Sequence, residues 1–134
     1  MIKQPITYVD FNGEERTENF YFHLSMPEVV RLEAKIGASL DEHSKQLAKD
    51  KDLDGMIAFL ENVVLSAYGI KSEDGRSFKK NEDLRSEFEN SNAYAELFQM
   101  LLTQPELASK FGAGVADNGK KTKNRVTPNV ELSK

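Results

Sequence analysis

The chain has 134 residues, no cysteine and a formal net charge of −4, and these values exclude several classes of protein. Without cysteine neither a disulfide framework nor a thiolate zinc site can form, and two histidines are too few for a histidine-rich metal site. No apolar run approaches the ~20 residues that span a bilayer, and the N-terminus lacks the apolar core of a signal peptide. We therefore expect a soluble, cytoplasmic protein with no membrane partner.

The charge is unevenly distributed along the chain. Residues 117–134 contain five Lys or Arg and two acidic residues, a balance of +3, which leaves −7 on the remainder. An acidic body argues against a nucleic-acid partner, because phosphate contacts need a basic surface. We expect a helical domain at residues 1–115 and a flexible basic tail at 116–134. A small nucleic-acid binder that uses Lys120 to Arg125 is the competing hypothesis.

An N-terminal β-hairpin is predicted from two alternating segments, strands at about 5–11 and 15–24. Asn12-Gly13 between them is a strong hairpin signal, since a type I′ turn needs positive φ at both central residues. A two-residue turn places odd residues of the first strand on the same face as even residues of the second. The apolar face would then contain Val9, Phe11, Phe20, Phe22 and Leu24.

The remaining chain predicts helices. Residues 53–68 are apolar almost all round, which is typical of a helix inside a domain, and residues 93–102 form the second strongest amphipathic helix. Three segments have the capping-box pattern that begins a helix, namely Ser25 to Glu28, Ser39 to Glu42 and Thr103 to Glu106. Gly112 and Gly114 are predicted to end the last helix, and Asp74-Gly75 to close a second hairpin or a tight loop.

These elements predict the fold class. We expect a mainly α protein with an N-terminal β-hairpin, of the α+β class. Its architecture would be a small single-domain helical bundle followed by a disordered C-terminal tail.

Residues 50–61 match the EF-hand calcium loop. Oxygen ligands would come from Asp50, Asp52, Asp54, the backbone of Met56 and a bidentate Glu61, and Gly55 would make the sharp turn. Against this, Ala58 supplies no oxygen and the chain offers no second loop for pairing. The competing interpretation is an acidic N-terminal cap on the core helix. A single EF-hand-like calcium-binding module is thus the alternative function, and we assign no metal ligands.

No residue pattern indicates catalysis. His23 and His43 are predicted on the surface, and neither belongs to a recognisable catalytic triad. The carboxylates of Asp41 and Glu42 are adjacent in a predicted helix, so they do not face each other. We therefore predict a protein that is not an enzyme, with no catalytic residues and no cofactor.

A family resemblance is carried by several segments taken in order, namely residues 7–22, 24–25, 54–55 and on through the core helix, 68–78, 84–88, 93–98 and 108–111. The match is densest at 68–78, which reads YGIKSEDGRSF. Together these segments resemble the tail assembly chaperones of long-tailed, siphovirus-type bacteriophages and prophages. No single segment is a catalytic signature, but the ordered set is fairly specific.

The resemblance implies a non-enzymatic assembly factor in the cytoplasm of the bacterial host, absent from the mature virion. Such chaperones bind the long helical tape measure protein and help recruit tail tube protein, and many have a longer form made by ribosomal frameshifting. Self-association is left open, and partner-binding residues are unknown. The candidates for an exposed apolar surface, each better explained as core, are Phe20, Phe22, Phe88 and Phe98.

Overall fold

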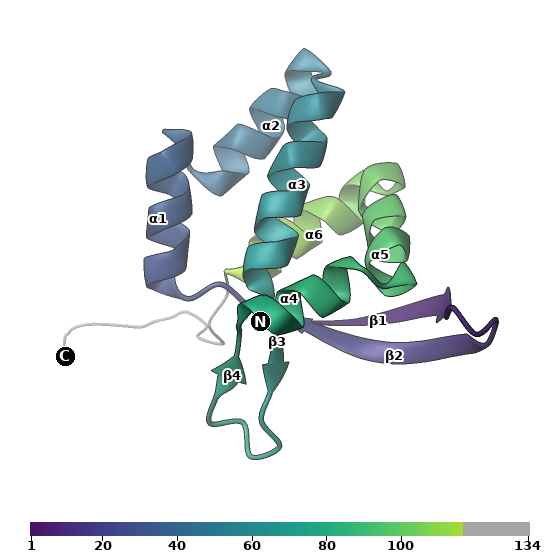
Figure 1. Cartoon of the computed structure of the whole chain (residues 1–134). Coiled ribbons are helices and arrows are strands. Elements are labelled where there is room, and N and C mark those ends of the chain that lie inside the picture. Colours follow the sequence, from purple (N-terminus) through teal and green to yellow (C-terminus); the bar gives the residue numbers. More distant parts are fainter. Residues whose placement is uncertain (117–134) are drawn as a thin grey trace.

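The computed structural model describes residues 1–116, and the α+β fold class is confirmed (Figure 1). The basic tail predicted at 116–134, apart from its first residue, lies outside the described residues, as do Lys120 to Arg125. In chain order the elements are β1 (Ile2–Val9), β2 (Glu15–Phe22), α1 (Met26–Ile36), α2 (Leu40–Asp50), α3 (Leu53–Ala67), β3 (Tyr68–Lys71), β4 (Phe78–Lys79), α4 (Glu82–Glu89), α5 (Asn92–Thr103) and α6 (Pro105–Val115).

The strands form one antiparallel sheet in the order β1-β2-β3-β4. The β1–β2 hairpin runs beneath α5, and the β3–β4 hairpin points away from the helices at the bottom of the view (Figure 1). α5 and α6 pack against β1, while α2 packs against both α3 and α6. α1 and α5 lie on opposite sides of α3, and α6 runs behind α3, as Figure 1 shows.

The predicted hairpin is present, but its predicted register is wrong by one residue. Ile6 pairs with Glu18, so even-numbered residues of both strands share the inner face. Val9 and Phe11 therefore do not join the core, and they are 52% and 78% exposed. A slip of one residue turns a strand over, so the first strand faces the opposite way from the prediction, while Phe20, Phe22 and Leu24 of the second strand face the core as predicted.

The turn explains the register. The amide of Gly13 donates to the carbonyl of Asp10 at 2.9 Å, and Gly13 has a left-handed φ of 84° while Asn12 does not take a positive φ. This is a type I turn followed by a left-handed glycine, which lengthens the loop beyond a type I′ turn. The Asp10 carboxylate accepts from the amides of Asn12 and Glu14 and from Arg16 Nε. The Arg16 hydrogen bond and these amides lower the pKa of Asp10.

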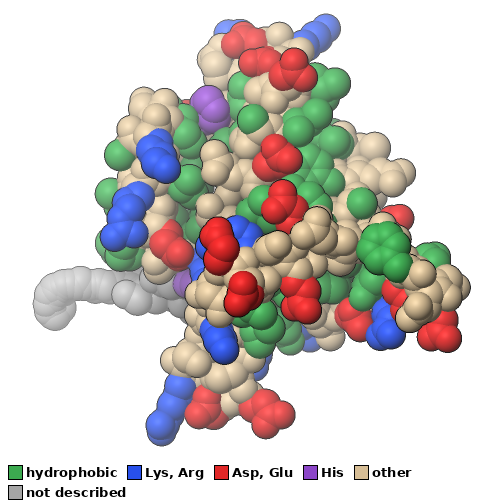
Figure 2. All heavy atoms as spheres, viewed as in Figure 1, with side chains coloured by type: hydrophobic (Ala, Val, Ile, Leu, Met, Phe, Trp, Pro, Cys, Tyr) green, Lys and Arg blue, Asp and Glu red, His purple; other side chains and the backbone are tan. Residues whose placement is uncertain are grey.

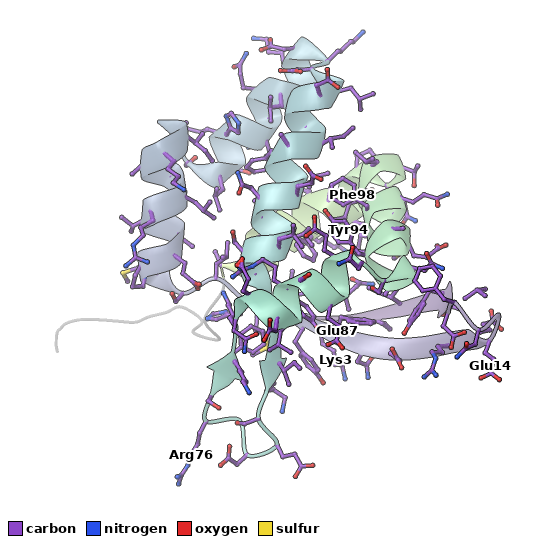
Figure 3. All side chains as sticks on the ribbon, in the orientation of Figure 1. Lys3, Glu14, Arg76, Glu87, Tyr94 and Phe98 are labelled. Atoms are coloured by element: carbon purple, nitrogen blue, oxygen red, sulfur yellow. The ribbon has the colours of Figure 1, made fainter. Side chains whose placement is uncertain are left out.

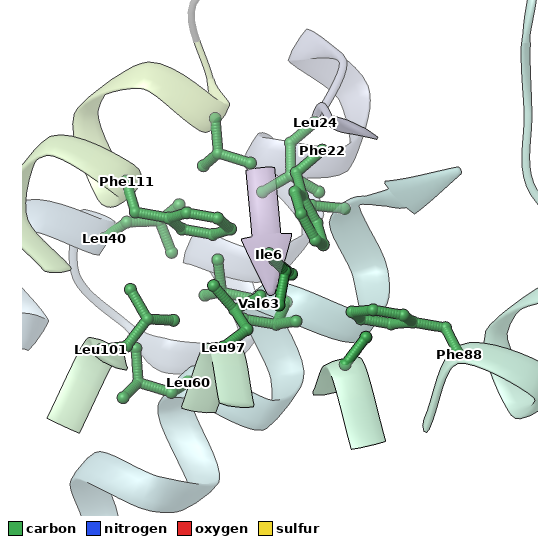
Figure 4. Packing of buried hydrophobic residues seen from close by; sticks show 14 residues of the cluster. Ile6, Phe22, Leu24, Leu40, Leu60, Val63, Phe88, Leu97, Leu101 and Phe111 are labelled. Atoms are coloured by element: carbon green, nitrogen blue, oxygen red, sulfur yellow. The ribbon is translucent and has the colours of Figure 1, made fainter. Parts of the chain in front are cut away.

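The central position of α3 is confirmed. Val64 and Ala67 are fully buried, and the core extends from them to both strands of the first hairpin and to α4, α5 and α6 (Figure 4). Phe22 and Phe88 belong to this core, so they are not the exposed surface for which they were candidates. Phe20 and Phe98 are partly buried and pack against the same cluster.

The predicted helix ends are confirmed in part. The Ser25 amide donates to Glu28 Oε1 at 2.8 Å, and Ser39 Oγ accepts from the amide of Glu42 at 3.1 Å. The third capping box is wrong, because α5 continues through Thr103, whose hydroxyl donates to a carbonyl one turn earlier.

The last helix also ends later than predicted. α6 runs through both of its glycines to Val115, because Phe111 and Val115 anchor its inner face with 2% and 0% exposure. Gly114 permits a close approach, since a Cβ there would lie 3.0 Å from Ile2 Cγ1. The second hairpin predicted at Asp74-Gly75 is present as β3–β4.

One ion pair ties α1 to the rest of the fold. Lys80 Nζ donates to both carboxylate oxygens of Glu28 at 2.9 Å and to the carbonyl of Ser66 at 2.8 Å. Burial raises the pKa of Glu28, but the hydrogen bonds from the Ser25 amide and from Lys80 outweigh it, so the pKa lies below its usual value. The charge of Glu28 therefore stabilises the folded state above the pKa of the unfolded chain, near 4.5, and this stabilisation is lost as the pH falls through the folded pKa.

Glu28→Gln tests this pair, because glutamine can still reach the Ser25 amide but carries no charge. We expect the free energy of unfolding to fall by about 0.5–1 kcal/mol at pH 7, and the difference from the native protein to shrink below about pH 4. Urea unfolding between pH 3 and 7 measures this, with Glu14→Gln at the exposed hairpin turn as the control (Figure 3). A difference that stays constant over the whole pH range would contradict the assignment.

Candidate functional site

An apolar groove of about 650 Å³ lies between α2, α3, α5 and α6. Its polar rim is formed by Asp41, Ser44, Lys45, Lys51, Asp52 and Ser109. Its apolar lining consists of Leu40, Leu47, Ala48, Leu53, Met56, Phe59, Leu60, Val63, Leu101, Leu102, Pro105, Ala108, Phe111 and Ala113.

The groove has a buried floor and an exposed lip. Leu101 and Phe111 on the floor are each 2% exposed, whereas Leu53 and Leu102 at the lip are 64% and 39% exposed. Hydrophobic side chains gather along α3 in the space-filling view (Figure 2). Exposure of large apolar side chains to water is unfavourable, and a partner that covers them makes the free energy more favourable. A concave surface of such side chains is therefore typical of a binding site.

The joint between α2 and α3 shapes one end of the groove. Lys51 takes a left-handed φ of 55°, and the amide of Asp52 donates to the carbonyl of Leu47 at 3.1 Å. The Asp52 carboxylate then accepts from the amide of Gly55 at 2.9 Å and caps α3. A Cβ on Gly55 would lie 2.5 Å from Asp52 Oδ2 and 2.8 Å from Leu47 Cδ2, so glycine leaves room here for the capping carboxylate and for the leucine of α2.

The same joint shows that the calcium-loop hypothesis is wrong. Asp50 is still in α2, where Gln46 donates to its carboxylate, and Asp54 and Glu61 both lie within the continuous helix α3. The five proposed ligands therefore do not surround one point, and no cluster of metal-ligating residues occurs within residues 1–116. The competing interpretation, an acidic cap on the core helix, is confirmed at Asp52.

The two histidines are less exposed than predicted. His43 on α2 lies edge-on to Phe59 with ring centroids 5.2 Å apart, and His23 lies edge-on to Phe78 at 6.1 Å. Both are intermediate in exposure. The helix-surface carboxylate of Asp41 pairs with Lys45 at 3.0 Å, so it does not form a dyad with Glu42.

Sequence patterns did not identify the groove residues as a site. The available signal was the wide apolar arc of residues 53–68, which has more apolar positions than one packed face can cover.

Within residues 1–116, no helix is long and apolar enough to cross a membrane.

The fold is a small α+β domain with an apolar groove between four of its helices. A family model described as phage tail assembly chaperone matches residues 1–125. Searches of curated proteins and of solved structures each gave no match. The chain therefore belongs to the phage tail assembly chaperone family, which confirms the resemblance of the sequence. Membership implies a non-enzymatic role with protein partners in tail assembly.

Proposed function

We propose that this chaperone binds the tape measure protein of a long-tailed phage or prophage and helps recruit tail tube protein during tail morphogenesis. It acts in the cytoplasm of the bacterial host and is absent from the mature virion. Family membership supports the general role. The observation that carries the finer proposal is the apolar groove with its exposed leucine lip.

A groove of this kind suits the apolar face of a partner helix. An α-helix with side chains is about 10–12 Å across, and it presents apolar residues three and four positions apart to such a surface. Fully burying a fully exposed leucine contributes roughly 1.5–3 kcal/mol, and Leu53 and Leu102, which are 64% and 39% exposed, would each contribute part of that. Leu53 and Leu102 at the lip would therefore stabilise the complex and shield the client helix from aggregation.

Co-expression of the tape measure protein with this chain tests the proposal. We expect the tape measure to be soluble with the native chaperone and to aggregate without it. The variant Leu53→Glu with Leu102→Glu should lose this effect, because burying an unpaired carboxylate opposes docking. The matched control is Val9→Glu, which changes a side chain that is 52% exposed on the hairpin.

The fraction of soluble tape measure protein separates two kinds of failure. A tape measure that is equally soluble without this chain would contradict the chaperone function. A groove variant that is as effective as the native protein would contradict the site alone.

A further inference from the structure

α1 carries a second exposed apolar surface. Met26, Val30 and Ala34 are four residues apart, so they share one face of the helix. All three are exposed, with Met26 at 74% and Val30 at 58%. The inner face of α1 is apolar as well, and Val29, Leu32 and Ile36 pack against the core there. α1 is therefore apolar on the side that faces solvent and on the side that faces the domain.

Cations lie beside this outer stripe. Arg31 and Lys35 are exposed on α1 and line a cleft of about 220 Å³, to which Arg85 of α4 also contributes. The cleft contains one carboxylate, that of Glu28, and Lys80 already pairs with it at 2.9 Å. Figure 2 shows Lys and Arg side chains on α1 next to hydrophobic ones.

This cationic patch stands out against the charge of the body. The whole chain carries −4 and residues 117–134 carry +3, so residues 1–116 carry −7. Such a body repels nucleic acid, and the apolar stripe offers phosphate nothing to bind. The surface instead combines an apolar stripe with positive charge along one edge.

We propose that the α1 face, made of Met26, Val30, Arg31, Ala34 and Lys35, binds a helix of a partner protein that has acidic side chains along one edge of its apolar stripe. The partner's apolar residues would cover Met26 and Val30. Its carboxylates would pair with Arg31 and Lys35, and opposite charges facing each other would fix the orientation of the helix.

The α1 face goes beyond the proposed function because it shares no residue with the groove. The groove is lined by α2, α3, α5 and α6, and α1 contributes no residue to it. A client in the groove and an acidic helix on α1 can therefore be held at the same time.

Fluorescence anisotropy with two synthetic helical peptides tests the proposal on the full chain. Both peptides have the same leucine stripe, and one edge carries Glu in the first and Lys in the second. We expect the Glu peptide to bind at least ~10-fold more tightly than the Lys peptide, a difference of about 1.4 kcal/mol. Raising the salt concentration should reduce this preference.

Surface variants locate the binding. Arg31→Glu with Lys35→Glu should weaken binding of the Glu peptide at least ~10-fold, because like charges then face each other. The matched control is Arg76→Glu at the tip of the β3–β4 hairpin, far from α1 (Figure 3), and it should bind the peptide as the native protein does. The groove variant Leu53→Glu with Leu102→Glu no longer offers the groove to the leucine stripe, but it should keep the preference for the Glu peptide over the Lys peptide, which separates this surface from the proposed function.

Three results would overturn the proposal. The first is equal affinity for both peptides, or no saturable binding up to about 1 mM, which corresponds to −4.1 kcal/mol. The second is loss of the preference for the Glu peptide in the groove variant while the Arg31 and Lys35 reversals leave that preference unchanged. The third is a change in sedimentation mass caused by the Arg31 and Lys35 reversals, which would show that a second copy of this chain occupies the α1 face.

Discussion

Phe22→Ala is expected to lower the free energy of unfolding by about 3–5 kcal/mol. The side chain is fully buried, and its ring centroid lies 5.2–5.9 Å from those of Tyr68, Phe88 and Phe111. Figure 4 shows Phe22 and Phe111 within the packed core. Alanine removes the ring at the point where β2, β3, α4 and α6 meet, and the surrounding elements cannot all collapse into the space.

Phe11→Ala is the matched control, because it is the same substitution in the same hairpin. Phe11 is 78% exposed, so we expect a change within about 0.5 kcal/mol. Urea unfolding of both variants measures the contrast. Equal losses in the two variants would mean that Phe11 is also in the core, as the type I′ register required, and would contradict the observed strand pairing.

Gly69→Ala is expected to destabilise the fold by about 1–3 kcal/mol. A Cβ at this position would lie 2.6 Å from Phe78 Cε2 and 2.7 Å from the carbonyl oxygen of Lys79. The carbonyl belongs to β4, whose pairing with β3 holds it in place. Relief of the clash therefore requires the two strands to separate.

Gly112→Ala is expected to stabilise the fold, in contrast to Gly69→Ala. Gly112 lies within α6, and a Cβ there would meet no atom within 4 Å. Alanine in an open helical position is favoured over glycine by about 0.5–1 kcal/mol. Thermal unfolding should therefore move the Tm down for Gly69→Ala and up for Gly112→Ala. A Tm that is unchanged or raised in Gly69→Ala would contradict the clash, and a lowered Tm in Gly112→Ala would contradict the open position in α6.

Local patterns predicted most elements of the fold but not the way in which two of them pair. Asn12-Gly13 indicated a turn correctly, because glycine supplies the left-handed residue. The register depends on Asp10, whose carboxylate binds two amides of the loop and so selects the longer turn. Period-two alternation is compatible with either face, so the pattern alone could not decide between them.

The candidate site could be predicted only in part. The apolar excess of residues 53–68 indicated that α3 has more than one packed face, but the groove needs three other helices to form around it. The acidic residues at 50–54 matched a calcium loop in spacing, yet Asp52 caps α3 and Asp50 stays in α2. Helix capping and calcium binding use the same residue types, so spacing did not distinguish them.

Photo-crosslinking to the tape measure protein tests the central claim most directly. A photoreactive amino acid at position 53, in the exposed lip of the groove, should crosslink to the tape measure in co-expressing cells. The same group at position 11, on the exposed hairpin turn, should not. Crosslinks at 53 and none at 11 are the result we predict. Crosslinks at 11 without any at 53 would contradict the groove as the client-binding site.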